Sequence, residues 1–155
     1  MTRRIYIDTS VFGGYFDDEF KETTIPFFEK LAAEGIIIIV SEVLELEIYR
    51  APKFIRDFFE SMPTSLIERV ELTEEVQTLA EKYIFENVVG KTSRADCQHI
   101  ALATIYRADV LVSWNFKHIV NLERIRGYNS VNLREGYQMT EMRTPKETFD
   151  YEDTE

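Results

Sequence analysis

The chain has 155 residues, of which 45% are hydrophobic and 30% charged. This balance is typical of one folded domain that buries its own core. The net charge of −10 argues against a broadly basic face for nucleic acids, so such a partner would need a local basic patch or a bound cation. The single cysteine, Cys97, excludes an intrachain disulfide. We expect a cytoplasmic protein without a signal peptide, because the apolar run behind the basic start meets Asp8 and no apolar stretch is long enough to span a bilayer.

Strand patterns and helix patterns alternate along the chain. Helices are predicted over residues 19–34, 41–50, 53–61, 73–86, 93–107 and 118–124. Strands are predicted over residues 4–8, 36–40, 66–72, 109–113 and 130–133, and a turn over residues 9–14 at Gly13 and Gly14. This alternation predicts an α/β fold, a three-layer α/β/α sandwich with a mostly parallel central sheet. We expect one domain over residues 1–140 and a charged C-terminal tail over residues 141–155.

Polar residues follow several of the predicted strands. In parallel sheets, ligands bind beyond the carboxyl ends of the strands. The residues expected at that edge are Asp8 after the first strand, Glu47 in the helix after Ser41, Asp96 in the first turn of its helix, and Ser113 and Asn115 after the fourth strand. Carboxylates brought close together repel one another, and a divalent cation removes that penalty. Oxygen ligands favour Mg²⁺ or Mn²⁺ over Zn²⁺, and such a cation can promote phosphodiester hydrolysis.

Four segments, in order and spacing, resemble the motifs of PIN domains, including VapC-type toxins. They are Ile-Tyr-Ile-Asp-Thr-Ser at residues 5–10, Ser-Glu-Val-Leu-Glu-Leu-Glu at 41–47, Asp-Cys-Gln-His-Ile-Ala-Leu-Ala at 96–103, and Leu-Val-Ser-Trp-Asn-Phe-Lys-His at 111–118. The resemblance implies a PIN-like fold and an endoribonuclease that uses Mg²⁺ or Mn²⁺. It also implies an RNA substrate, an antitoxin partner and a homodimer.

The same resemblance assigns the catalytic and metal-binding residues: Asp8, Glu47, Asp96 and Asn115. Many family members carry aspartate where this chain has Asn115. Asparagine can ligate through its carbonyl oxygen or hold a metal-bound water, but it supplies no charge. Ser10, Ser113 and His99 are expected to support the site.

Each acidic residue has an alternative interpretation. Asp8 is also suited to an Asx turn, and Glu45 is the alternative to Glu47 as a ligand. Ser93 and Asp96 have the spacing of a capping box, in which Asp96 would satisfy the helix start.

Cations and aromatic rings near these motifs are candidate substrate contacts. The possible phosphate contacts are Lys91, Arg94 and Lys117, and His118 is more typical of a surface or capping residue. The rings that could stack on bases are Tyr15, Phe16 and Trp114, although aromatic residues more often pack in cores.

Two other functions compete with the ribonuclease. An aspartate-based phosphatase needs a second aspartate two residues after the first, where this chain has Ser10. A catalytically inactive, PIN-like binding module is favoured by Asn115 and by the net charge of −10. Metal-dependent stabilisation distinguishes an enzyme from such a module.

Overall fold

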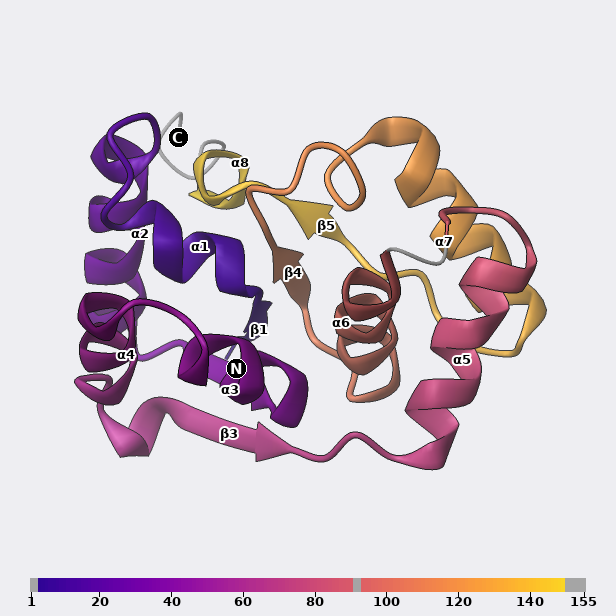
Figure 1. The fold of residues 1–155 in the computed structure, drawn as a ribbon, viewed down its shortest axis with the longest axis horizontal. Helices are drawn as coiled ribbons and strands as arrows, with labels where there is room; N and C mark the ends of the chain where they lie inside the picture. The colour runs from indigo at the N-terminus through magenta and orange to yellow at the C-terminus, as the bar shows by residue number, and fades with distance from the viewer. Residues whose placement is uncertain (1–2, 91–92, 150–155) are drawn as a thin grey trace.

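The computed structural model describes residues 3–90 and 93–149 and is organised around a five-stranded sheet (Figure 1). The strands are β1 (Arg4–Ile7), β2 (Ile37–Ser41), β3 (Ile67–Val70), β4 (Val110–Val112) and β5 (Met142–Arg143). Their order is β3-β2-β1-β4-β5, and every neighbouring pair is parallel. The predicted α/β class is therefore confirmed, with a sheet that is parallel throughout.

Helices cover both faces of the sheet. They are α1 (Thr9–Gly14), α2 (Lys21–Glu34), α3 (Glu42–Tyr49), α4 (Lys53–Glu60), α5 (Glu74–Phe85), α6 (Arg94–Ile105), α7 (Leu122–Arg134) and α8 (Pro145–Phe149), with a 3₁₀ turn, η1 (Thr64–Leu66). Figure 1 shows α1, α2 and α4 on one side and α5, α6 and α7 on the other. Within the described residues, no helix has both the length and the apolar character needed to cross a membrane.

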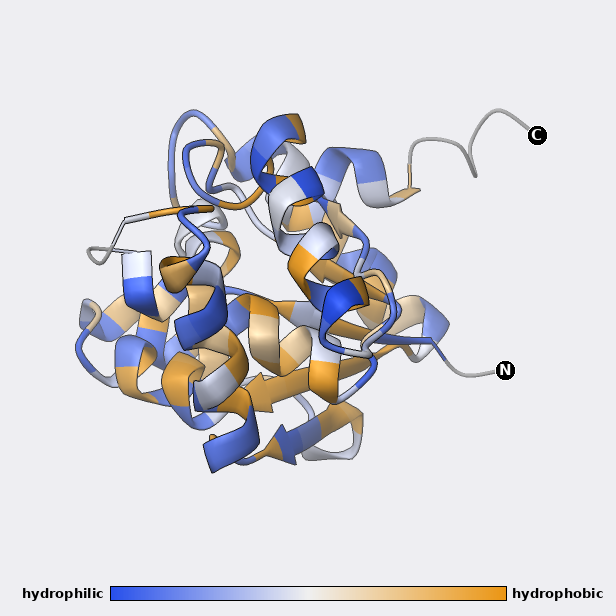
Figure 2. Ribbon diagram, turned by 90° about the vertical axis from the view of Figure 1, so that its right-hand side faces the viewer, coloured by the Kyte–Doolittle hydropathy of each residue, from blue (hydrophilic) through white to orange (hydrophobic). Residues whose placement is uncertain are grey.

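The strands supply alternate residues to two hydrophobic cores. Ile5 and Ile7 pack in the core that contains Phe12, whereas Tyr6 packs in the core that contains Tyr83. All five side chains are fully buried. In Figure 2 the largely apolar central strands lie between helices. These helices carry both apolar and hydrophilic residues. Burial on both faces explains the continuous β-branched run that predicts β2.

The chain order creates a topological switch point at the carboxyl edge of the sheet. From β1 the chain adds β2 and β3 on one side, and it then adds β4 and β5 on the other side. The switch point therefore lies between the carboxyl ends of β1 and β4, where ligands bind in open α/β sheets. Asp8 directly follows β1, and Ser113 directly follows β4.

The predicted turn over residues 9–14 is wrong, because this segment is the helix α1. Gly14 serves close packing and not chain reversal. A Cβ atom on Gly14 would lie 2.8 Å from the Trp114 ring, so only glycine lets α1 approach that ring. Gly35 does act as the predicted stop signal, because it ends α2 in the left-handed conformation with φ of 63°.

Two further predictions near the C-terminus are corrected. Residues 130–133 are not a strand but the second half of α7, and the helix predicted over residues 118–124 begins only at Leu122. Asn129 and Asn132 are buried one helical turn apart and hydrogen-bond each other at 3.1 Å, an arrangement that only a helix provides.

The expected tail contributes to the fold as far as Phe149. Strand β5 pairs with β4, and Phe149 of α8 is buried with its ring centroid 5.6 Å from that of Phe27. The expected domain boundary at residue 140 is therefore corrected: residues 141–149 belong to the folded domain. The remainder of the predicted tail, residues 150–155, lies outside the described residues.

Candidate active site

Asp8 is anchored at the switch point by two serines. Its side chain is 4% exposed, and Ser10 Oγ donates to Asp8 Oδ1 and Ser113 Oγ to Asp8 Oδ2, both at 2.6 Å. Each serine oxygen also accepts a backbone N–H, from Trp114 for Ser10 and from Asn115 for Ser113, both at 2.9 Å. The loop after β4 is thereby fixed to the end of β1. Ser10 and Ser113 thus occupy the supporting positions that the sequence predicts.

Glu47 reaches the same edge from α3. Ser41 caps this helix by accepting the Leu44 N–H at 3.1 Å. Glu47 Oε1 contacts Thr9 Oγ1 at 2.7 Å and His99 Nε2 at 2.5 Å. Glu45 instead accepts a hydrogen bond from Arg69 at 3.0 Å, on the β3 side. Of the two candidate glutamates, Glu47 is therefore the one that contacts His99 and Thr9 at this edge.

Asp96 projects from the first turn of α6 without capping that helix. Ser93 makes no side-chain capping bond, and its buried hydroxyl has no partner among the described residues. The capping-box alternative is therefore wrong. Asp96 instead interacts with Asn115, His99 and Glu47, three residues that come from different elements.

The electrostatics show that these carboxylates share one site. Burial raises the pKa of Asp8 most, and the negative charge of Asp96 raises it further, although His99, Ser10 and Ser113 oppose the shift. Burial also raises the pKa of Asp96 most, and Glu47 adds to that effect, whereas His99, His118 and Asn115 oppose it. Burial alone would raise the pKa of Glu47 as well, but the contacts from His99 and Thr9 outweigh it and lower that pKa.

Asn115 completes the cluster on the β4 side. Its Oδ1 accepts the His118 N–H at 2.9 Å, and its side chain also contacts Asp96. The four predicted residues Asp8, Glu47, Asp96 and Asn115 are thus brought together at the carboxyl edge, although they come from four separate segments.

The donor set suits a hard divalent cation. It consists of carboxylate and amide oxygens, the ligand type that Mg²⁺ and Mn²⁺ prefer. Across residues 3–90 and 93–149, no group of three or more Asp, Glu, His or Cys side chains is arranged to hold a metal. Mg²⁺ usually keeps several waters and binds through one or two carboxylates together with substrate phosphates, so a complete protein cage is not required.

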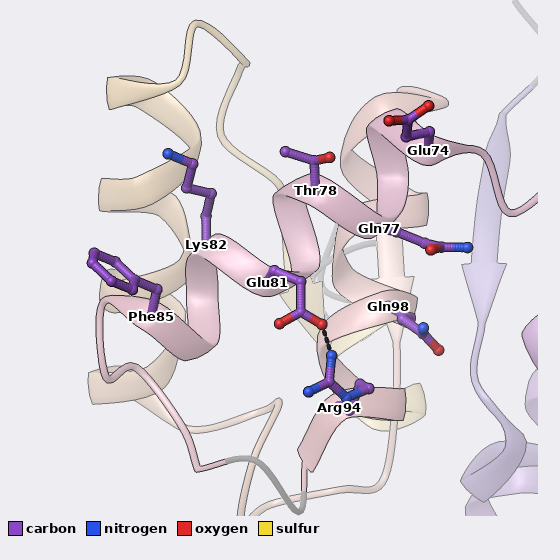
Figure 3. A pocket seen from close by; sticks show the side chains of 8 residues that line it. All are labelled: Glu74, Gln77, Thr78, Glu81, Lys82, Phe85, Arg94 and Gln98. Carbon is purple, nitrogen blue, oxygen red and sulfur yellow. Dashed lines mark ion pairs between the residues drawn. The ribbon is translucent and has the colours of Figure 1, made fainter.

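The candidate phosphate contacts separate in space. Arg94 forms an ion pair with Glu81 and lines a groove of about 620 Å³ between α5 and α6, with Phe85 and Gln98 (Figure 3). Lys117 is exposed in the loop after β4, two residues beyond Asn115. Lys91 lies outside the described residues. Of the candidate phosphate contacts that the structure describes, Lys117 is therefore the one on the loop that also carries Asn115.

The candidate stacking rings are partly used by the fold. Tyr15 stacks on Phe58 with centroids 4.0 Å apart, and Trp114 stacks on Phe20 at 4.4 Å. Phe16 packs edge-on against Phe54 at 4.9 Å. Tyr15 and Trp114 thus each have one face covered by a protein ring.

Sequence reasoning missed two polar residues of the site. Tyr6 OH lies 2.6 Å from His99 Nδ1, and Thr9 donates to Glu47. A hydroxyl-bearing Tyr6 between two isoleucines of a buried strand was the available signal, because a buried phenol needs a hydrogen-bond partner.

Comparison with solved structures shows which fold this is. VapC20 from Mycobacterium tuberculosis, a sarcin-ricin loop cleaving toxin, matches 73% of this chain and 91% of its own length, with a TM-score of 0.56 and 12% identity. VapBC2 from Rickettsia felis, bound to a promoter DNA fragment, matches 90% and 98%, with a TM-score of 0.56 and 16% identity. FitAcB from Neisseria gonorrhoeae matches 91% and 97%, with a TM-score of 0.59 and 13% identity.

No family model and no curated protein sequence matches the chain. The likeness therefore rests on three-dimensional structure, with identities too low to carry more than the fold. The resemblance that the four sequence motifs indicate is confirmed at that level: the chain has a PIN-like fold similar to that of VapC toxins.

Proposed function

We propose that this protein is an endoribonuclease that depends on Mg²⁺ or Mn²⁺. The observation that carries the proposal is the convergence of Asp8, Glu47 and Asp96 at the switch point, with burial and mutual repulsion raising the pKa of both aspartates. Such an arrangement disfavours its own charges until a cation neutralises them. The same fold in a toxin that cleaves the sarcin-ricin loop favours RNA as the substrate.

The side chains divide the work of phosphodiester hydrolysis. Asp8 and Asp96 would be the principal ligands of the cation, Glu47 would complete the acidic cluster, and Asn115 would orient a water. When bound, the cation supplies the positive charge that activates water and stabilises the leaving oxygen. Ser10 and Ser113 hold Asp8 in one orientation. Because the protein carries a net charge of −10, we expect RNA binding to be weak without the cation.

The biological setting that fits this activity is a cytoplasmic toxin–antitoxin pair, with an antitoxin protein as partner and a homodimer as the assembly. Similarity to VapBC2 and VapC20 supports a toxin of this kind. Co-purification of the chain with the product of a neighbouring gene tests the antitoxin, and light scattering tests the dimer.

The decisive experiment is cleavage of labelled RNAs, single-stranded and structured and including a sarcin-ricin loop, in EDTA, Mg²⁺ or Mn²⁺. Asp8→Asn should lower the rate at least ~100-fold, because it removes charge stabilisation as well as ligand position. Asn115→Ala should cost less, and Asn115→Asp should raise activity by adding charge to the cluster. Cleavage that survives EDTA or Asp8→Asn unchanged would exclude this chemistry.

The second candidate is the inactive binding module, and Asn115 is the residue that favours it. Across the described residues, the lack of a preformed three-ligand group points the same way. Metal titration separates the two functions. An inactive module shows neither cleavage of any RNA nor a metal-induced rise in Tm, whereas the nuclease shows both.

A further inference from the structure

A buried chain of hydrogen bonds connects the end of β2 to Glu47. Ser41 Oγ and Tyr6 OH are 2.6 Å apart, Tyr6 OH and His99 Nδ1 are 2.6 Å apart, and His99 Nε2 and Glu47 Oε1 are 2.5 Å apart. Ser41, Tyr6 and His99 are at most 2% exposed. Water therefore does not compete for the Ser41–Tyr6 and Tyr6–His99 bonds, whose protons must be shared among these three side chains. The Glu47 side chain at the other end is 36% exposed.

The donors and acceptors define one direction for this chain. Ser41 Oγ accepts the Leu44 N–H, and its other partner among the described residues is Tyr6. The Ser41 hydroxyl hydrogen therefore goes to Tyr6, and the Tyr6 hydrogen goes on to His99 Nδ1. The Tyr6 phenol is fully buried, and burial disfavours its charged form, so the phenol keeps its proton.

The Glu47 end of the hydrogen-bond chain agrees with this direction. Glu47 Oε1 accepts a hydrogen bond from Thr9 Oγ1, and an ionised carboxylate can only accept hydrogen bonds. His99 Nε2 must therefore carry a hydrogen. A neutral ring with hydrogen on Nε2 alone satisfies every member, whereas hydrogen on Nδ1 would leave the Ser41 hydroxyl hydrogen without an acceptor among the described residues.

We propose that Tyr6 and His99 are positioning residues for the metal site: Tyr6 fixes the Nε2–H tautomer of His99, and His99 fixes the carboxylate of Glu47. Thr9 Oγ1 donates to the same oxygen, Oε1, at 2.7 Å. Both bonds end on Oε1, so Oε2 would be the oxygen available to a cation. This role rests on the proposed function, because it takes Glu47 as a metal ligand.

The structure offers a matched control for Tyr6. Tyr83 is also fully buried, and its hydroxyl donates to Asn132, in the core away from the acidic cluster. Tyr6→Phe and Tyr83→Phe each delete one buried hydroxyl and should each lower Tm. A purely structural role for Tyr6 predicts that the two variants behave alike in every other respect.

The test measures Mn²⁺ affinity by calorimetry without RNA, and the protonation of the histidine ring nitrogens by heteronuclear NMR near neutral pH. In the wild type, His99 should carry hydrogen on Nε2 only. His99→Leu should weaken Mn²⁺ binding about 10- to 100-fold, the usual effect of removing a group that orients a ligand. Tyr6→Phe should weaken it about tenfold, while His99→Gln, which keeps an N–H donor, should retain more affinity than His99→Leu. Tyr83→Phe should bind Mn²⁺ as the wild type does.

The results separate this inference from the proposed function. Hydrogen on Nδ1, alone or together with Nε2, overturns the proton order in the chain. Wild-type Mn²⁺ affinity in folded Tyr6→Phe and His99→Leu overturns the positioning role. A wild-type protein that binds no Mn²⁺ overturns the proposed function and the metal role of the chain together, while the NMR measurement still decides the tautomer.

Discussion

The two ends of the central sheet differ in how their charged side chains are paired. At the amino end, Arg4 at the start of β1 pairs with Glu68 of β3 at 2.6 Å, and its backbone N–H donates to Asp109 at 2.7 Å. At the carboxyl end, Asp8, Glu47 and Asp96 form no ion pair with a lysine or arginine among the described residues. They are held by serine and threonine hydroxyls, His99 and Asn115.

The pKa shifts express the same difference. The Arg4 contact lowers the pKa of Glu68, against the effect of its burial, so that pair favours folding. Burial raises the pKa of Asp8 and Asp96, so their charges oppose folding. A protein keeps buried like charges without cationic partners where function needs them, most often where an ion or substrate supplies the missing charge. The carboxyl end is therefore the end of the sheet at which we propose the active site.

The largest expected effect is on catalysis, and it compares one aspartate from each end. Asp96→Asn should lower the rate of metal-dependent RNA cleavage at least ~100-fold, because it removes a ligand and the charge that holds the cation. Asp109→Asn, at the exposed amino end, should leave the rate within about twofold of wild type, the range expected for a surface change remote from the site. Equal losses in the two variants would break the functional distinction between the ends.

An intermediate effect is expected on the stability of the metal-free protein, with opposite signs at the two ends. In EDTA, Asp8→Asn should raise Tm by about 2–4 °C, the shift that ~1 kcal/mol produces in a domain of this size. Glu68→Gln should lower Tm by a smaller amount, because its side chain is 37% exposed and solvent screens the pair with Arg4. Calorimetric melting of both variants against wild type measures the two shifts. Saturating Mg²⁺ should reduce or reverse the advantage of Asp8→Asn.

The two effects also differ in their dependence on pH. The folded-state pKa of Asp8 is raised, so its unfavourable contribution is fully present above that value and is lost progressively as pH falls from it to the unfolded-state pKa. The folded-state pKa of Glu68 is lowered, so its favourable contribution is present above the unfolded-state pKa and disappears as pH falls through the folded value. Lowering the pH should therefore shrink both differences, the one for Asp8→Asn from the raised folded-state pKa of Asp8 downward and the one for Glu68→Gln from the unfolded-state pKa of glutamate downward. A gap for Asp8→Asn that widens on acidification would show that this carboxylate is structural.

The fold was predictable where local pattern and environment agree. The β-branched run of β2 and the alternation of strands with helices identify a parallel sheet, because burial on both faces leaves that pattern in the sequence. The second half of α7 was not predictable in this way. Its buried Asn129 and Asn132 bond to Thr140 and Tyr83, and these partners are distant in the chain. A prediction from neighbouring residues does not include those partners, and Val131 and Leu133 alone favour a strand.

The residues of the candidate site also fall into two groups, those that local sequence pattern predicts and those that depend on distant partners. Asp8, Glu47, Asp96 and Asn115 follow from strand ends and motif spacing, which depend on backbone topology. Tyr6 and Thr9 were missed because their roles depend on side-chain partners 93 and 38 residues away. The paired charges of the amino end also lie far apart in sequence, with 64 residues between Arg4 and Glu68. Pattern therefore locates the acidic residues, and only the structure shows which of them are paired and which are not.

The smallest expected effect concerns the two described cations proposed to contact phosphate, and it refines the comparison within the carboxyl end. Arg94 is already paired with Glu81, whereas Lys117 is exposed on the loop that carries Asn115. Lys117→Ala should raise KM for RNA about two- to fivefold with little change in kcat, the effect of losing an exposed charge contact of ~0.2–1 kcal/mol. It should also reduce the slope of log affinity against log salt by about 0.7, the value for one contact to a single strand. Arg94→Ala should leave that slope unchanged, because its charge is already balanced by Glu81.

The measurement is RNA binding and cleavage over a salt series for both variants. A reduced slope for Arg94→Ala and not for Lys117→Ala would instead place the RNA backbone across the groove between α5 and α6 (Figure 3).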